Sequence, residues 1–406
     1  MGLLPNINMS EFGYNLPDDR IAKYPASERD SSKLLVYRDA EIQEYLFCNL
    51  PEILPENGLI LFNNTKVIHA RLQFRKETGA AIEIFCLEPT TPSDYQISLS
   101  AQQSCTWKCL IGNKKKWKKD ALKKLFRINN RDITLSAEIV SDTNNESLIR
   151  FSWDTTDCSF AEILEHEGEI PLPPYLNRNA EPSDTIRYQT VYSRFDGSVA
   201  APTAGLHFTD TVLAEISRKN ITCSELTLHV GAGTFKPVSE SNVENHTMHR
   251  EHFSVSVETL NQIRNNLGNI TITGTTSLRA VESLYWLAGR IQRGETAAHL
   301  SQWEPYTFQN EISAADAIDI LLEYCQKQNI AAFSASTSVM ILPGYQFRFA
   351  DRLITNFHQP KSTLLLLVAA FIGNDWKKVY DVALNHNFRF LSYGDSSLLF
   401  KANNWL

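Results

Sequence analysis

The chain has 406 residues, of which 43% are hydrophobic, 10% aromatic and 21% charged, and its formal net charge is −7. This composition excludes disordered, collagen-like and coiled-coil classes, and the length allows two or three domains with substantial cores. The seven cysteines include no Cys-x-x-Cys pair, so we expect free thiols in a reducing compartment. The first residues lack the features of a secretion signal, which predicts a cytoplasmic protein.

Residues 57–72 alternate apolar and polar side chains as two strands would, with a turn at Asn63 and Asn64. Short β-type runs such as AIEIFCL and ITLSAEIV, separated by polar turns, continue from there to about Trp153. The pattern predicts a small all-β domain over residues 71–155, inserted into a larger domain made of residues 1–70 and 156–406.

Basic side chains are concentrated in the predicted insertion. Between Arg71 and Asp154 there are 14 basic and 10 acidic residues, so the rest of the chain is strongly acidic. Much of the surplus lies in one cluster with Trp107 and Trp117 interleaved: Lys114, Lys115, Lys116, Lys118, Lys119, Lys123, Lys124 and Arg127. Such a cluster can bind phosphates while indoles stack on bases. The alternative is a solvated hairpin with extended lysines.

After Asp154 the pattern changes to strands followed by helices, which favours an α/β core. ITITG leads into a helix from Thr275, and RLITNF leads into STLLLLVAAFIG. The apolar run Leu364–Ile372 is shorter than the about 20 residues of a membrane span, so we expect a buried helix and no membrane insertion. Residues 290–329, with apolar side chains at helical spacing around Leu321, are predicted to form an extra helical excursion on the core.

Small and polar residues mark the places where these strands end. Residues 272–277 carry four hydroxyls before a helix containing Arg279, which suits an anionic or ribosyl group, although simple N-capping is the alternative. The loop 197–209 is rich in small residues, so its backbone could approach a flat ligand closely or merely pack as a tight turn. His207 in this loop is a candidate acid or base, although a lone histidine is more often structural.

Residues 246–252 hold three imidazoles and a carboxylate, yet a zinc site is disfavoured because the spacing is not His-Glu-x-x-His. Gly231 and Gly233 do not form a dinucleotide fingerprint, because Lys236 replaces its third glycine. Residues 356–363 and 392–395 cluster polar side chains that could line a pocket or turn the chain. The residues alone thus predict a cytosolic α/β enzyme with His, Thr, Arg and Asp in its site.

Taken in order, these segments resemble one family, the S-adenosylmethionine:tRNA ribosyltransferase-isomerases of queuosine biosynthesis. The resemblance is carried by YNLP (14–17), RDSSKLLV (29–36), NNTKVI (63–68), IPLPPY (170–175), YQTVY (188–192), the 197–209 loop, LHVGAGTF (228–235), MHRE (248–251), GTTS (274–277), PGY (343–345), 351–363 and SYGD (392–395). The chain resembles a long and somewhat divergent member of this family. It departs from the family pattern at Asn15, Lys33 and Gln359, where the family usually has Asp, Arg and Leu.

The resemblance implies a large α/β-barrel-like domain with a smaller inserted β-barrel domain. It also implies transfer and isomerisation of the ribosyl moiety of S-adenosylmethionine onto 7-aminomethyl-7-deazaguanine in the tRNA anticodon, giving epoxyqueuosine, adenine and methionine. No metal is required by that chemistry, and a monomer is expected. Two alternatives stay open: a paralogue that uses S-adenosylmethionine with another acceptor, and a non-catalytic tRNA-binding protein.

Candidate site residues follow from this resemblance and from the chemistry, which needs a base for the acidic C5′ hydrogen and an acid for the leaving adenine. The candidate acids and bases are His207, His229, His249, Glu251, His358 and Asp395. Proton transfer is assigned preferentially to His207 or His249, with Glu251 or Asp395 orienting. The expected substrate contacts are Gly274, Thr275, Thr276, Arg279, Thr203, Gly205 and Tyr393, and the expected tRNA contacts are Lys115, Lys116, Lys118 and Lys119.

Overall fold

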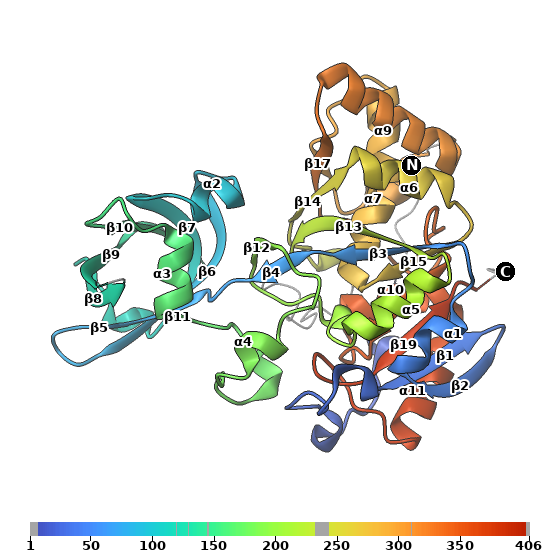
Figure 1. The fold of residues 1–406 in the computed structure, drawn as a ribbon, viewed down its shortest axis with the longest axis horizontal. Coiled ribbons are helices and arrows are strands. Elements are labelled where there is room, and N and C mark those ends of the chain that lie inside the picture. The colour runs from blue at the N-terminus through green and yellow to red at the C-terminus, as the bar shows by residue number, and fades with distance from the viewer. Residues whose placement is uncertain are drawn as a thin grey trace.

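The computed structural model describes residues 7–118, 120–128, 130–143, 146–231, 243–309 and 311–402. These residues form a larger lobe around a mixed sheet and a smaller lobe around an antiparallel sheet (Figure 1). Two short parallel strands, β4 (Thr65–Val67) and β12 (Phe195–Ser198), lie where the chain passes between the lobes. The mixed α/β class predicted from the sequence is therefore confirmed.

Within the described residues, ten strands form the sheet of the larger lobe. Their spatial order is β16 (His299–Leu300), β17 (Ala332–Thr337), β14 (Glu251–Ser256), β13 (Thr222–His229), β3 (Leu59–Asn63), β15 (Ile270–Thr273), β18 (Arg352–Asn356), β19 (Ser396–Phe400), β1 (Lys33–Arg38) and β2 (Glu41–Leu46). The central strands β13, β3, β15 and β18 are parallel to one another. Strands β3 and β15 are buried at every residue and, apart from Asn63, apolar or β-branched, because elements cover both faces of the sheet at its centre.

Helices surround this sheet (Figure 1). They are α1 (Leu50–Ile53), α5 (Asp210–Arg218), α6 (Val257–Asn265), α7 (Thr275–Gln292), α8 (Glu304–Thr307), α9 (Ala314–Gln328), α10 (Thr363–Ile372) and α11 (Trp376–Asn385). Helix α4 (Asp184–Arg187) lies between the two lobes in Figure 1. Helix α10 is apolar along its length and starts at Ser362, whose hydroxyl accepts the Leu365 N–H as an N-cap. Its burial confirms the prediction for Leu364–Ile372.

The segment 290–329 contains more than helix. It includes α8 and α9, and its strand β16 pairs in parallel with β17 at one edge of the large sheet. Helix α9 packs against α6 and α7, with Leu321 and Cys325 among its buried side chains.

The smaller lobe is a curled antiparallel sheet in the order β11 (Gly168–Glu169), β5 (Arg71–Arg75), β6 (Ala81–Thr91), β7 (Ser104–Gly112), β10 (Ser147–Trp153), β9 (Arg131–Asp142) and β8 (Leu122–Ile128), with helices α2 (Tyr95–Leu99) and α3 (Phe160–Glu167). It has its own apolar core, in which Trp107, Phe151 and Phe160 are completely buried. Trp107 is 0% and Trp117 4% exposed. The hypothesis that these two indoles stack on bases is therefore wrong.

All seven cysteines are free thiols, and five of them are buried. In the described part of the chain, no helix is both long and apolar enough to cross a membrane.

Candidate active site

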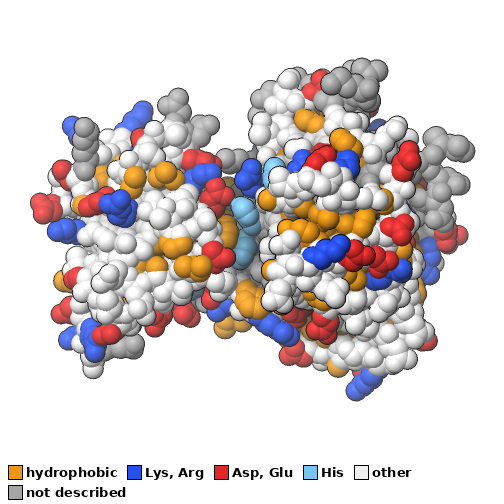
Figure 2. Space-filling model, turned by 90° about the horizontal axis from the view of Figure 1, so that it is seen from above, with side chains coloured by type: hydrophobic (Ala, Val, Ile, Leu, Met, Phe, Trp, Pro, Cys, Tyr) orange, Lys and Arg blue, Asp and Glu red, His pale blue; other side chains and the backbone are white. Residues whose placement is uncertain are grey.

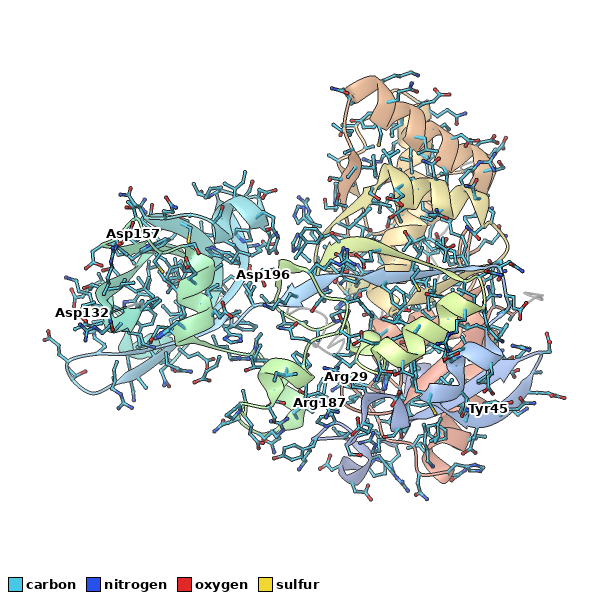
Figure 3. The ribbon with its side chains drawn as sticks, in the orientation of Figure 1. Arg29, Tyr45, Asp132, Asp157, Arg187 and Asp196 are labelled. Carbon is cyan, nitrogen blue, oxygen red and sulfur yellow. The ribbon has the colours of Figure 1, made fainter. Side chains whose placement is uncertain are left out.

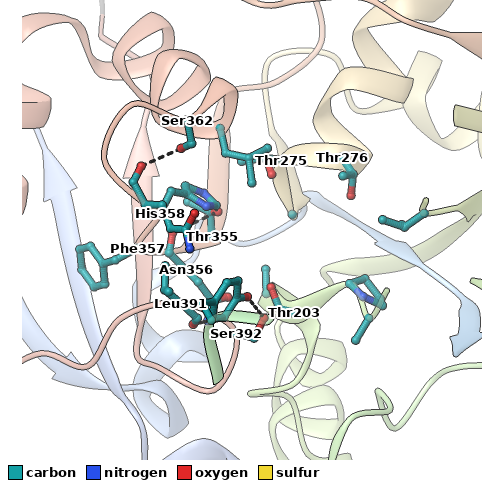
Figure 4. A pocket seen from close by; sticks show the side chains of 18 residues that line it. Thr203, Thr275, Thr276, Thr355, Asn356, Phe357, His358, Ser362, Leu391 and Ser392 are labelled. Carbon is teal, nitrogen blue, oxygen red and sulfur yellow. Dashed lines mark hydrogen bonds between the residues drawn. The ribbon is translucent and has the colours of Figure 1, made fainter. Parts of the chain in front are cut away.

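A pocket opens at the carboxyl ends of β15 and β18, two neighbouring parallel strands. Open α/β sheets bind ligands at this edge, outside the strand ends. The pocket encloses about 700 Å³, including the part open to solvent. The residues that line it are Tyr175, Ala201, Pro202, Thr203, Ala204, Val230, Gly274, Thr275, Thr276, Thr355, Asn356, Phe357, His358, Gln359, Ser362, Leu364, Leu391 and Ser392 (Figure 4). None of these described residues is Asp, Glu, Lys or Arg.

Helix α7 begins at this pocket. Gly274, its N-cap, has φ of +92°, a conformation that favours glycine, and no side chain caps the helix. The first-turn N–H groups of an uncapped helix need partners from outside the helix, and the helix dipole favours an anion there. The structure thus brings together four of the expected substrate contacts, Thr203, Gly274, Thr275 and Thr276, in one pocket.

His358 also lines this pocket. Its Nε2 lies 2.9 Å from the Thr355 hydroxyl oxygen, and its backbone N–H donates to the Tyr380 hydroxyl. Burial lowers the pKa of His358 to about 3, so its imidazole is neutral at pH 7. A neutral imidazole has one donor and one acceptor nitrogen, so His358 can hydrogen-bond a ligand, but this pKa makes it a weak base.

His207 lies behind the pocket, in a separate hollow, and contacts Asn356 of the pocket wall. Asn356 Nδ2 donates to the Leu391 carbonyl over 3.0 Å and contacts His207 Nε2 at 3.3 Å. Because Nε2 accepts a hydrogen bond from the Asn356 amide, Nδ1 carries the proton and donates a hydrogen bond to Ser32 Oγ, 2.7 Å away. Burial, together with the nearby Arg389 charge, lowers the pKa of His207 to about 3.

The Asn356 amide is left with one unused atom. Both interactions of its Nδ2 fix the orientation of the amide, and Oδ1 is buried without a partner among the described residues. An unsatisfied buried acceptor is costly, and this one belongs to a residue of the pocket wall. Asn356 therefore provides a hydrogen-bond acceptor for an N–H or O–H group of a ligand.

His249, Glu251 and Arg279 form a chain of charge-assisted contacts. His249 Nε2 lies 3.1 Å from Glu251 Oε1, and Arg279 Nη1 donates to Glu251 Oε2 over 2.9 Å. Glu251 is 1% and Arg279 3% exposed, whereas the His249 side chain is 29% exposed. A carboxylate that orients a partly exposed imidazole is the usual arrangement of a general base. A Cβ at Gly231, one residue after Val230 of the pocket wall, would lie 3.9 Å from His249 Cδ2.

Arg279 does not reach the pocket as a substrate ligand in this structure. Its Nε donates to the Val339 carbonyl and its Nη1 to Glu251. Arg279 therefore holds the carboxylate that orients His249.

His229 lies between the two lobes. Its ring stacks on Tyr95 of α2, with a centroid distance of 3.9 Å and an interplanar angle of 2°. Burial lowers the pKa of His229 to about 4. His229 does not line the pocket; its stack on Tyr95 joins β13 of the larger lobe to the smaller lobe. Histidine side chains, pale blue in Figure 2, are visible along the groove between the lobes.

Asp395, Tyr393 and Gly205 lie outside the pocket. Asp395 accepts the backbone N–H groups of Lys33 and Arg389, so its oxygens join two segments of the chain. Tyr393 lines the hollow that holds His207, and its hydroxyl donates to Asp184 Oδ1 over 2.7 Å. Gly205 is buried, and a Cβ there would lie only 1.9 Å from the Tyr192 hydroxyl oxygen.

The lysines expected to contact tRNA lie at a turn of the smaller lobe, between β7 and β8. Lys115, Lys116 and Lys118 are exposed there, and Lys119 lies outside the described residues. Other members of the basic cluster are paired, since Lys114 contacts Asp142 and Lys124 contacts Glu167. The local positive charge is therefore smaller than the sequence count indicates.

Thr355, Asn356 and Ser392 were not among the site residues predicted from the sequence, although Asn356 and Ser392 lie in the polar segments 356–363 and 392–395. The signal was present, because Thr355 and Asn356 are polar residues at the end of the buried strand β18. Among the described residues, no group of three His, Cys, Asp or Glu side chains is arranged to hold a metal ion.

Comparisons with known proteins agree over nearly the whole chain. A family model described as "Queuosine biosynthesis protein" matches residues 9–399. The S-adenosylmethionine:tRNA ribosyltransferase-isomerase of Trichlorobacter lovleyi is 36% identical over 398 residues, covering 96% of this chain and 99% of that protein. The enzyme of the same name from Aromatoleum aromaticum is 37% identical over 402 residues, covering 98% and 99%.

Among solved structures, the S-adenosylmethionine tRNA ribosyltransferase of Thermotoga maritima matches with a TM-score of 0.46 and 26% identity, covering 96% of this chain and 100% of that chain. The family match and the identities show that the chain belongs to the queuosine biosynthesis family of S-adenosylmethionine:tRNA ribosyltransferase-isomerases.

Proposed function

We propose that this chain transfers and isomerises the ribosyl moiety of S-adenosylmethionine onto 7-aminomethyl-7-deazaguanine in a tRNA anticodon, giving epoxyqueuosine in tRNA, adenine and methionine. The main support is family membership along the whole chain, together with a polar pocket at the carboxyl ends of β15 and β18. The relatives carry the name of this enzyme over almost their entire length.

S-adenosylmethionine binds in the pocket in this proposal. The first-turn N–H groups of α7 hold the methionine carboxylate, and the hydroxyls of Thr275 and Thr276 bind beside it. Asn356 Oδ1 accepts a hydrogen bond from the donor, which satisfies the buried oxygen. His358, neutral at pH 7, adds a further hydrogen bond without placing a second cation next to the sulfonium.

His249 is the proton-transfer residue of the proposal, and Glu251 orients it. With Nε2–H donating to Glu251, Nδ1 of His249 carries the lone pair that takes a C5′ proton, which the sulfonium makes acidic. The electron pair stays on C5′ as an ylide, and a proton must reach adenine as its bond to the ribose breaks. His207 acts one step away as a positioning residue, because its Nε2 holds the Asn356 amide in place.

The exposed lysines of the smaller lobe contact the tRNA backbone in this proposal. Lys115, Lys116 and Lys118 are exposed and project from one turn. Replacing all three with Glu should weaken tRNA binding and reduce its salt dependence, with Lys327→Glu on α9 of the larger lobe as the control. An unchanged salt slope would remove these lysines from the interface.

In this proposal both sheets curl into barrel-like shapes, and contacts between β5 and β8 support this closure in the smaller lobe. The domains divide at residues 71 and 155, the segment 290–329 is an excursion on the larger domain, and the protein acts as a cytoplasmic monomer without a metal.

The decisive assay measures adenine release from S-adenosylmethionine with tRNA that carries the deazaguanine base, with the same tRNA carrying guanine, and without tRNA. We expect release only with the first, accompanied by a mass gain on that nucleoside. His249→Gln should lower kcat by at least about 100-fold, the size of a general-base contribution, whereas the exposed neighbour His252→Gln should retain activity. Adenine release without dependence on the modified tRNA would instead support a paralogue with another acceptor.

A further inference from the structure

The hollow that contains His207 is lined by three guanidinium groups. Arg29, Arg187 and Arg389 come from the segment before β1, from helix α4 and from the loop before β19, and we call their shared cavity the arginine hollow. Arg29 and Arg187 lie near each other beside α4 in Figure 3. The hollow adjoins the pocket, because Ser392 lines both. The hollow encloses about 280 Å³, including the part open to solvent.

The charges of this hollow are not balanced within the described residues. Arg389 pairs with Asp395 at 3.2 Å, but Arg29 donates only to the carbonyls of Leu206 and Ile186. Arg187 likewise donates only to backbone carbonyls, those of Ser27 and Ala26. The carboxylate of Asp184, which accepts the Tyr393 hydroxyl beside the hollow, is already paired with Arg178. Two guanidinium groups are thus held together without a carboxylate.

Holding two such cations together opposes folding unless an anion joins them. Burial lowers the pKa of Arg29, and the neighbouring Arg187 charge lowers it further. Arg187 Nε is buried without a partner, so a donor is still available in the wall of the hollow. His207 adds no charge, because burial keeps its imidazole neutral. The backbone carbonyls fix both guanidinium forks in place and leave N–H groups for an oxyanion.

We propose that the arginine hollow binds a backbone phosphate of the tRNA, close to the nucleotide that is modified. Guanidinium forks match the oxygens of a phosphate in geometry and charge. In the proposed function, the one carboxylate of S-adenosylmethionine binds elsewhere, at the N-terminus of α7. A phosphate bound beside Ser392 would keep the RNA next to the mouth of the pocket. This inference rests on the proposed function and adds an RNA contact on the larger lobe.

The first test measures tRNA affinity as a function of salt for Arg29→Gln and Arg187→Gln, each with its Lys counterpart. We expect each Gln variant to weaken binding about tenfold and to reduce the salt slope by about one, while the Lys variants retain the slope. Arg264→Gln, which removes an ion pair between α6 and Asp319 of α9, should change neither. The dissociation constant of S-adenosylmethionine should stay within about twofold in all variants.

A second measurement leaves the protein unchanged, since loss of a buried arginine can also unfold the chain. Neutral methylphosphonates replace, one at a time, the phosphates around the modified nucleotide of an anticodon stem-loop, and one position should weaken binding to the wild-type protein about tenfold. The proposal is overturned if no position does so, or if the Gln variants weaken only binding of S-adenosylmethionine. Adenine release by the wild-type protein, measured in parallel, reports separately on the proposed function.

Discussion

Replacing Glu251 by Gln tests the buried charge chain behind His249. The substitution keeps the shape of the side chain but removes the charge that pairs with Arg279, and both residues are at most 3% exposed. Removing one partner of a buried ion pair costs about 3–5 kcal/mol, because the other charge stays buried and unpaired. Arg279 is a severe case, since its Nη2 already has no partner among the described residues. At about 2–4 °C per kcal/mol, the unfolding midpoint should fall by at least about 6 °C.

A double variant distinguishes the loss of the Glu251–Arg279 ion pair from the cost of leaving one of its charges unpaired. Glu251→Gln with Arg279→Met removes both charges, and we expect it to recover much of the lost stability while adenine release stays low, because His249 loses its orienting carboxylate. The matched control is Glu323→Gln on α9, whose exposed ion pair with Lys327 should contribute less than about 1 kcal/mol. The reasoning is refuted if Glu251→Gln unfolds like this control, or if the double variant is no more stable than the single one.

Two further perturbations follow from other buried groups. His207 has a pKa of about 3 in the folded chain against about 6.5 when unfolded, so the unfolded state takes up the proton first and stability falls as the pH drops below about 6.5. Between pH 8 and pH 5 the free energy of unfolding should fall by about 2 kcal/mol because of His207. Urea titrations of His207→Gln should lack this part of the pH dependence, and an unchanged pH profile would show that His207 is not its source. Gly205→Ala should destabilise the chain by about 1–3 kcal/mol, because the new methyl group meets the Tyr192 hydroxyl, and Tyr192→Phe in the same chain should restore part of the loss in thermal unfolding. Full stability of the single Gly205→Ala variant would contradict this packing.

The strand-and-helix order was predictable because local chemistry dictates it. Strand β15 and helix α7 follow from a β-branched run, a glycine and an amphiphilic helical segment, and α10 follows from a short apolar run after a capping serine. For the same reason the polar ends of β15 and β18 could be placed together, since carboxyl ends of parallel strands meet at one edge.

Side-chain environments were harder to predict than elements. The alternation of Cys105, Trp107 and Cys109 along β7 turns all three into the core of the smaller lobe, and this period-two pattern was a stronger signal than the nearby lysines. The partners of Asp395 could not be predicted, because its oxygens accept N–H groups of Lys33 and Arg389, and Lys33 lies more than 300 residues away. Such contacts depend on tertiary register and leave no local pattern.

His207 lies between the arginine hollow and the pocket, and its hydrogen bonds on both sides require a neutral imidazole. Its Nδ1–H donates a hydrogen bond to Ser32 on the side of the arginine hollow, and its Nε2 accepts one from Asn356 on the side of the pocket. A protonated ring would need two acceptors, would lose the contact with the Asn356 amide and would add a fourth positive charge beside three arginines. An anion in the hollow would raise the pKa of His207 and an S-adenosylmethionine cation in the pocket would lower it, so the two ligands act in opposite senses on the same ring. A histidine NMR titration should therefore show the His207 pKa moving up with a bound anion and not with the cation alone.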